Sequence, residues 1–224
     1  MNKNIFVACD VSSQKEALEL LSKIHNEISG IKIGLQYITR CSTENIKELG
    51  KFNKPIFYDG KFFDIKNTLM ESIKSLKELK VSYATVHLLN GLNALKAANK
   101  VAIDLDIKLL GVSILTSFDN QELEMLGFKD QVKDQVLRLI KIADQANLHG
   151  VICSPLEVKM IKEIAPKLKC FTPGIRQNED VNDQKRTMNA KQAIEEGSDC
   201  LIIGRPITKG DPKKNIQEIL HSID

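Results

Sequence analysis

The segment IFVACDVSSQKEALELLSKIHNEI, residues 5–28, predicts one β-strand followed by one α-helix. Its first five residues are apolar and typical of a buried strand, whereas the following residues place apolar side chains at helical spacing. Ser12 or Ser13 can cap the helix, because a hydroxyl just before the first turn accepts a bond from a free backbone N–H. The apolar face of this helix is formed by Ala17, Leu20, Leu21, Ile24 and Ile28.

The same alternation of a short apolar run and a longer amphipathic segment recurs along the chain. Strands are expected at residues 5–9, 31–35, 55–58, 83–89, 108–115, 150–154, 169–173 and 199–204. Helices are expected at 12–28, 65–79, 91–105, 130–147, 156–168, 190–197 and 212–223, with a weaker one at 42–49. Eight units in 224 residues favour a single-domain (β/α)8 TIM barrel spanning residues 1–224, because such barrels begin at about 200 residues.

A doubly wound open sheet is the alternative fold, since it also alternates strand and helix. That fold most often carries a glycine-rich turn after its first strand, where this chain has Asp10-Val11-Ser12-Ser13. Proline and glycine are spread singly, and no low-complexity tract divides the chain. One barrel domain is therefore the better interpretation.

The composition argues against several classes of protein. Lysine and arginine (32) nearly balance aspartate and glutamate (29), and the net charge of +3 is too weak to predict a nucleic-acid partner. No apolar run is long enough for a membrane span, and the first residues do not resemble a signal peptide. The five cysteines lack metal-site or CxxC spacing and mostly fall in strand-like runs, as expected of reduced core residues in a cytoplasmic protein.

Polar and charged residues follow the predicted strands, at the barrel end where active sites form. A single polar residue there is unremarkable, but charged residues follow most of these strands. Stability alone does not explain that pattern, so we expect a functional site at this end. The residues concerned are Asp10, Lys32, Asp59, Lys61, Asp64, His87, Thr116, Ser154, Arg176, Gly204 and Arg205.

The densest charged cluster is DGKFFD, residues 59–64, with Lys32 expected on the neighbouring strand. If strand geometry continues through Lys61, its side chain points to the same side as that of Asp59, because side chains alternate along a strand. A lysine between carboxylates keeps its proton, since opposite charge favours the charged form, and can serve as a proton donor. A solvated salt-bridge cluster in a surface loop is the alternative interpretation.

A phosphate site is expected after the last two strands, where barrels frequently bind phosphate. Gly204 and Arg205 follow the apolar run 200–203, and a guanidinium group matches the geometry of phosphate oxygens. The polar segment 176–186 is a candidate lid over that site. Alternatively, Arg205 pairs with a surface carboxylate and the segment is an ordinary surface loop. No spacing of histidine, cysteine and aspartate predicts a metal site, and no P-loop or GxSxG motif occurs.

Together these motifs resemble the orotidine 5′-phosphate decarboxylase family, whose members convert orotidine 5′-phosphate (OMP) to UMP and CO₂ (EC 4.1.1.23) in pyrimidine biosynthesis. The resemblance extends over residues 10–208 in order. The DxKxxD pattern alone is shared with sugar-phosphate decarboxylases, whereas the later motifs are more specific. The matching parts are Asp10, KIG at 32–34, DGKFFDIKNT at 59–68, LTS at 115–117, TPGIR at 172–176, DQKR at 183–186 and GRPIT at 204–208.

The resemblance implies a homodimeric enzyme that needs no cofactor or metal. Its catalytic array would comprise Lys32, Asp59 and Lys61 of one subunit and Asp64 of the neighbouring subunit, with Lys61 as proton donor to C6 of the pyrimidine. The implied substrate contacts are Asp10, Lys32 and the neighbour's Thr68 on the ribose, Thr116 by the pyrimidine, Arg176, Gln184, Gly204 and Arg205 on the phosphate, and Asn67 in the same binding set.

The sequence departs from the family pattern at three points. Phe63 and Lys66 stand where histidine and proline are usual, Gly60 stands where an apolar residue is usual, and residues 88–91 (LLNG) replace a small, glycine-rich turn after His87. None of these changes removes a charged group of the expected array. Two other functions stay open: a metal-dependent decarboxylase of a keto-sugar phosphate, and a barrel that binds a pyrimidine nucleotide without catalysis.

Overall fold

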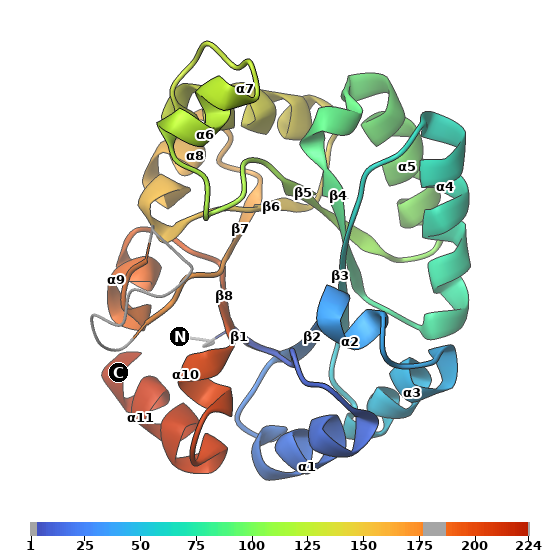
Figure 1. Cartoon of the computed structure of the whole chain (residues 1–224), viewed down its shortest axis with the longest axis vertical. Coiled ribbons are helices and arrows are strands. Elements are labelled where there is room, and N and C mark those ends of the chain that lie inside the picture. The colour runs from blue at the N-terminus through green and yellow to red at the C-terminus, as the bar shows by residue number, and fades with distance from the viewer. Residues whose placement is uncertain (1–3, 177–186, 224) are drawn as a thin grey trace.

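The computed structural model describes residues 4–176 and 187–223, which form a closed barrel of parallel strands (Figure 1). Each strand pairs with the next in sequence order, and β1 pairs with β8 to close the ring. The (β/α)8 prediction is confirmed, and the open sheet is wrong. The strands are β1 Ile5–Ala8, β2 Gly30–Gly34, β3 Ile56–Phe62, β4 Tyr83–His87, β5 Lys108–Val112, β6 Gly150–Ile152, β7 Lys169–Thr172 and β8 Cys200–Ile203.

The outer ring of helices also follows the sequence prediction, although most helices are shorter than their amphipathic segments. The first helix begins where the Ser13 hydroxyl accepts a bond from the Glu16 N–H, and it ends at Ile24, four residues before Ile28. The expected helices are α1 Gln14–Ile24, α3 Thr43–Glu48, α4 Lys66–Ser75, α5 Leu92–Asp104, α7 Val132–Gln145, α8 Val158–Ile164, α9 Ala190–Glu195 and α11 Pro212–Ile223.

Three short helices and four 3₁₀ turns were not predicted, because each has too few residues to show a periodic pattern. The helices lie in the connections that leave the carboxyl ends of β2, β5 and β8, on the side of the barrel where the pocket forms. They are α2 Leu35–Ile38, α6 Asn120–Met125 and α10 Arg205–Thr208, and the 3₁₀ turns are η1 Leu49–Phe52, η2 Leu76–Leu79, η3 Leu88–Asn90 and η4 Pro155–Glu157.

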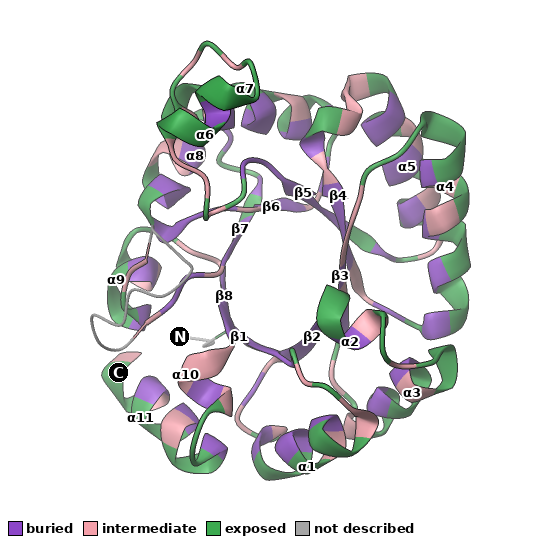
Figure 2. Cartoon of the chain, viewed as in Figure 1, coloured by how far each residue is buried: buried purple, intermediate pink, exposed green. Residues whose placement is uncertain are grey.

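Two apolar cores hold the barrel together. The larger core lies between strands and helices, and Figure 2 shows helices buried where they face the strands and exposed on their outer sides. The smaller core fills the barrel interior, where the rings of Phe6, Phe57 and Phe171 meet edge to face with centroids 6.1 to 6.4 Å apart. Because these rings fill the interior, an open pocket can form only above them, at the strand ends.

The cysteines agree with the compositional analysis. All five thiols are free, four of them are buried, and Cys41 is half-buried, so the prediction of core cysteines holds for four. Among residues 4–176 and 187–223, no helix combines the length and apolar character needed to cross a membrane.

Candidate active site

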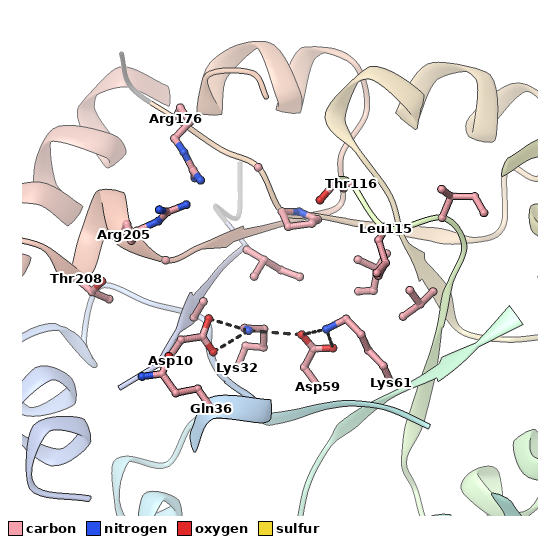
Figure 3. A pocket seen from close by; sticks show the side chains of 18 residues that line it. Asp10, Lys32, Gln36, Asp59, Lys61, Leu115, Thr116, Arg176, Arg205 and Thr208 are labelled. Atoms are coloured by element: carbon pink, nitrogen blue, oxygen red, sulfur yellow. Dashed lines mark hydrogen bonds and ion pairs between the residues drawn. The ribbon is translucent and has the colours of Figure 1, made fainter. Parts of the chain in front are cut away.

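The carboxyl ends of the strands surround a pocket of about 500 Å³ (Figure 3). It brings together eight of the residues predicted from the sequence: Asp10, Lys32, Asp59, Lys61, Thr116, Arg176, Gly204 and Arg205. Its floor includes Ala8 and Ile202, which also belong to the core inside the barrel. A volume of this size suits a small organic ligand.

Four of these residues form a row of alternating charges. Lys32 Nζ lies 3.1 Å from Asp10 Oδ1 and 3.5 Å from Asp59 Oδ2. Lys61 Nζ lies 2.9 Å from both carboxylate oxygens of Asp59. The row therefore ends in an ammonium group that faces the pocket, as Figure 3 shows. The predicted meeting of Lys32, Asp59 and Lys61 is confirmed.

The centre of the row is buried. Lys32 and Asp59 are 7% and 9% exposed, whereas the side chain of Lys61 is one-third exposed at the pocket surface. Burial raises the pKa of Asp59, but the positive charges of Lys32 and Lys61 and the hydrogen bonds from Lys61 and Thr85 outweigh it and hold the pKa below its usual value. Asp59 is therefore negatively charged at neutral pH, next to the Lys61 ammonium.

Gly34 makes room for the ion pair between Asp10 and Lys32. A Cβ atom at this position would lie 2.5 Å from Asp10 Oδ1 and 3.0 Å from Lys32 Nζ. Any larger residue would displace the Asp10 carboxylate and crowd the Lys32 ammonium. The KIG motif therefore needs glycine at this position for steric reasons.

Strand β3 does not keep regular geometry through Lys61, so that premise of the sequence prediction is wrong. Tyr58 pairs with Ala84 and Phe62 with Val86, and a β-bulge leaves residues 59–61 opposite a single residue of β4. Lys61 itself has φ of 48°, in the left-handed region. The bulge, and not the regular alternation of side chains along a strand, places the Lys61 ammonium beside the Asp59 carboxylate.

Gly60 lies inside this bulge, and its neighbours explain why it departs from the family pattern. The rings of Tyr58 and Phe62 stack in parallel with centroids 5.7 Å apart. A Cβ atom on Gly60 would lie 2.7 Å from Cε1 of Tyr58. A side chain at position 60 would therefore collide with the ring of Tyr58.

The two arginines lie across the pocket from Lys61. Figure 3 shows the guanidinium groups of Arg176 and Arg205 directed into the cavity, with Thr208 nearby. The Arg176 N–H donates to the Met188 carbonyl oxygen (3.0 Å), and the Met188 N–H donates to the Gly174 carbonyl oxygen (3.3 Å). These bonds join the chain at the start of the candidate lid to the chain beyond its end. Gln184 and the rest of that lid, residues 177–186, lie outside the described residues.

The other predicted residues that the structure describes do not line the pocket. Asp64, Asn67 and Thr68 are all exposed at and beyond the end of β3. Two apolar neighbours in the same segment are also exposed, Phe63 by 62% and Ile65 by 74%. This segment therefore lies outside the pocket of its own barrel.

Asn90 fixes the segment that carries Asp64. Its amide nitrogen donates to the carbonyl oxygens of Phe62 (2.9 Å) and His87 (2.7 Å), and its amide oxygen accepts from the Asp64 N–H (3.1 Å). The residue belongs to the LLNG sequence that replaces the family's small turn. A side chain thus ties together the ends of β3 and β4.

Three further residues at or beside the site, Asn90, Thr85 and Gln36, were not predicted from the sequence. Thr85 is a polar residue between the apolar residues Ala84 and Val86 of β4, and that contrast was the available signal. Gln36 lines the pocket from α2, a helix too short to predict. Asn90 acts through side-chain bonds to backbone groups, which leave no pattern in the sequence.

Asp10 and Asp59 are the acidic residues that line the pocket, and both bind Lys32. Across residues 4–176 and 187–223, no three histidine, cysteine, aspartate or glutamate side chains gather as they would around a metal ion. Among the described residues, the pocket therefore offers a metal ion only two carboxylates, and both are already paired with Lys32.

Comparison with known proteins gives one consistent family. The model of the orotidine 5′-phosphate decarboxylase / HUMPS family matches residues 3–219. The orotidine 5′-phosphate decarboxylase of Wolbachia pipientis subsp. Culex pipiens is 38% identical over 98% of either chain, and that of Actinobacillus pleuropneumoniae serotype 5b is 37% identical over the whole of both. The crystal structure of the Lactobacillus acidophilus enzyme has a TM-score of 0.88 at 32% identity and covers both chains fully. The chain therefore belongs to the orotidine 5′-phosphate decarboxylase / HUMPS family.

Proposed function

We propose that this protein is an orotidine 5′-phosphate decarboxylase, a carboxy-lyase that converts OMP to UMP and CO₂ in pyrimidine biosynthesis, with residues 1–224 as one catalytic domain. The observation that carries the proposal is the Lys61 ammonium, held by Asp59 in the pocket that also receives Arg176 and Arg205. The names of the relatives support the same reaction.

The charges of the pocket suggest how OMP binds. A phosphate suits the end with Arg176 and Arg205, since guanidinium groups bind phosphate oxygens in a bidentate manner. The ribose hydroxyls then reach Asp10 and Lys32, and the pyrimidine lies toward Thr116 and Lys61. Gln184 and Gly204 remain predicted phosphate contacts, and Asn67 a predicted member of the binding set.

In this orientation Lys61 carries the chemical step. The bond between C6 and the carboxylate carbon breaks, CO₂ leaves, and the electron pair stays on C6 as a carbanion in the ring plane. A positive charge placed there beforehand stabilises that developing charge. Lys61 then gives a proton to C6 to form the C–H bond of UMP, and solvent restores the lysine proton.

Asp59 acts through Lys61. The carboxylate is nearly fully buried and accepts two bonds from the ammonium. It therefore holds the lysine at a fixed place before substrate arrives, which avoids the cost of reorganising the charge during the reaction. Binding energy from the phosphate, which is remote from C6, can contribute to the same step.

We further propose a homodimer in which Asp64 and Thr68 complete the neighbour's site. Their exposure beside Phe63 and Ile65 supports this arrangement. Co-expression of Lys61→Ala with Asp64→Ala tests it, because a mixed dimer would contain one native site. We expect each variant alone to keep only a small residual activity and the mixture to recover about one quarter of native activity. No recovery would contradict a shared site.

Turnover tests the main proposal. The loss of OMP absorbance is followed with the native protein, with Lys61→Ala and with Lys15→Ala, which removes an exposed lysine of α1. We expect turnover by the native and Lys15→Ala proteins only. If the native protein binds UMP without turnover, the protein is a nucleotide-binding barrel instead, and undiminished turnover by Lys61→Ala would contradict the role of Lys61.

Dependence on metal separates the proposed enzyme from a keto-sugar-phosphate decarboxylase. We expect full OMP turnover after dialysis against EDTA, because the proposed step uses only side-chain charges. Loss of activity with EDTA and its return with a divalent cation would favour the metal-dependent enzyme.

A further inference from the structure

Thr85 is a fully buried threonine in the middle of β4. Its side chain makes two hydrogen bonds, both to β3. The backbone N–H of Lys61 donates to Thr85 Oγ1 (2.8 Å), and Thr85 Oγ1 donates to Asp59 Oδ1 (3.0 Å). One hydroxyl thus contacts both members of the ion pair on which the proposed chemistry depends.

The direction of these two bonds follows from the chemistry of the groups. A backbone N–H can only donate, so the hydroxyl oxygen must accept from Lys61. The single hydroxyl proton is then available for the Asp59 carboxylate, which can only accept. The bonds are therefore coupled, and loss of the hydroxyl removes both.

The β-bulge explains why a side chain is needed at this place. Residues 59–61 lie opposite Thr85 alone, so the Lys61 N–H bonds to the hydroxyl where a regular strand would use a backbone carbonyl. Lys61 also has the left-handed backbone that residues with a Cβ rarely adopt. Such a conformation persists only when surrounding contacts hold it, and Thr85 supplies one of them.

We propose that Thr85 is a positioning residue for the decarboxylation proposed above. Its hydroxyl holds the Lys61 backbone and the Asp59 carboxylate in one fixed arrangement. It thereby determines the position of the Lys61 ammonium relative to C6 of the substrate. The inference rests on the proposed function. Thr85 contacts neither substrate nor the reacting atoms, because it does not line the pocket. Its effect is on geometry, to which the rate of a positioned reaction is highly sensitive.

The test compares Thr85→Val, which keeps the shape and removes the hydroxyl, with Thr85→Ser, which keeps the hydroxyl. Thr172→Val is the matched control, since Thr172 is also fully buried but its hydroxyl lies 2.6 Å from that of Ser198. We expect Thr85→Val to lower kcat by about 10- to 100-fold, as expected for lost bonds to a charged group, while the Kd of UMP stays unchanged. Thr85→Ser and Thr172→Val should retain native kcat.

A second measurement does not depend on turnover. Asp59 faces Lys32 from β2, Lys61 from β3 and the Thr85 hydroxyl from β4, and all three lower its pKa. In a ¹³C NMR titration of the Asp59 carboxyl, Thr85→Val should raise this pKa and Thr85→Ser should not. Thr85→Ala provides the same comparison if the valine variant fails to fold.

These outcomes separate the two proposals. An inactive native protein in which Thr85→Val still raises the pKa of Asp59 would overturn the proposed function and leave the positioning of Asp59 intact. Native turnover together with undiminished kcat in Thr85→Val would overturn the role of Thr85. A parallel fall of kcat and UMP affinity that serine does not rescue would reduce Thr85 to a packing residue.

Discussion

Lys61 Nζ lies 2.9 Å from both carboxylate oxygens of Asp59, which lies two positions earlier in the same bulge of β3. The ammonium is thus fixed at the pocket surface by a carboxylate from its own strand. Arg176 and Arg205 line the other side of the same pocket. A ligand with a phosphate at one end and a ring that reaches Lys61 at the other could therefore contact both sides at once.

Replacement of Arg205 should separate phosphate binding from nucleoside binding. We expect Arg205→Ala to raise the Kd of UMP by about 10- to 100-fold, because charge-assisted bonds are lost, and to leave the weaker binding of uridine nearly unchanged. Titration calorimetry with both ligands measures the difference. Arg138→Ala, which removes an arginine of α7 that pairs with Asp130, is the control. Equal losses for UMP and uridine would place the phosphate elsewhere.

Asp199 should stabilise the fold without affecting catalysis. Its carboxylate, which precedes β8 at the opposite end of the barrel, accepts bonds from Lys162, from Lys169 and from the Cys170 N–H. We expect Asp199→Asn to lower the free energy of unfolding at pH 7 by about 1 to 3 kcal/mol and to leave kcat unchanged. Urea unfolding measures the loss, with the exposed Asp144→Asn as control.

The same carboxylate predicts a pH dependence. Burial raises the pKa of Asp199, but the bonds from Lys162, Cys170 and Lys169 outweigh it and lower the pKa. A lowered pKa means that the stabilisation is complete above the unfolded value of about 4 and is lost as the pH falls through the folded value. Urea unfolding of the native protein between pH 5 and pH 2 should show a loss that Asp199→Asn lacks, and equal slopes would contradict this assignment.

His87 should report the charge of Lys61. Burial lowers the pKa of the His87 imidazole, and the positive charge of Lys61 lowers it further. We expect an NMR titration to show that this pKa rises in Lys61→Ala but stays below the usual value, because burial remains. An unchanged His87 titration would mean that Lys61 is neutral or more distant in solution.

Asn90 should affect activity through Asp64. We expect Asn90→Ala to lower both the free energy of unfolding, by about 1 to 3 kcal/mol, and kcat, because the segment that presents Asp64 loses its anchor. In a double-mutant cycle, the variant lacking both side chains should be no less active than Asp64→Ala alone. Additive losses of activity would show that Asn90 acts independently of Asp64.

The order of elements could be predicted from the sequence, because burial of strands and of one helix face imposes a local pattern of apolar residues. The eight strands and the longer helices follow that pattern, and parallel pairing brings the ends of the strands to one side. For this reason the sequence alone assigns five charged residues to one pocket: Asp10, Lys32, Asp59, Arg176 and Arg205. The short helices α2, α6 and α10 could not be predicted, since a single turn has no periodicity.

By itself, then, the sequence determined the barrel, the side of the barrel that carries the site, and the charged groups within it. Only the tertiary structure decided how those groups meet. Contacts between β3 and β4 accompany the bulge in β3 and the left-handed backbone of Lys61, whose N–H bonds to the Thr85 hydroxyl. The ring of Tyr58 limits the space at Gly60. The physical reason is that an apolar pattern records only which side chains are buried, whereas the position of an ammonium group depends on specific hydrogen bonds and on the volume of its neighbours.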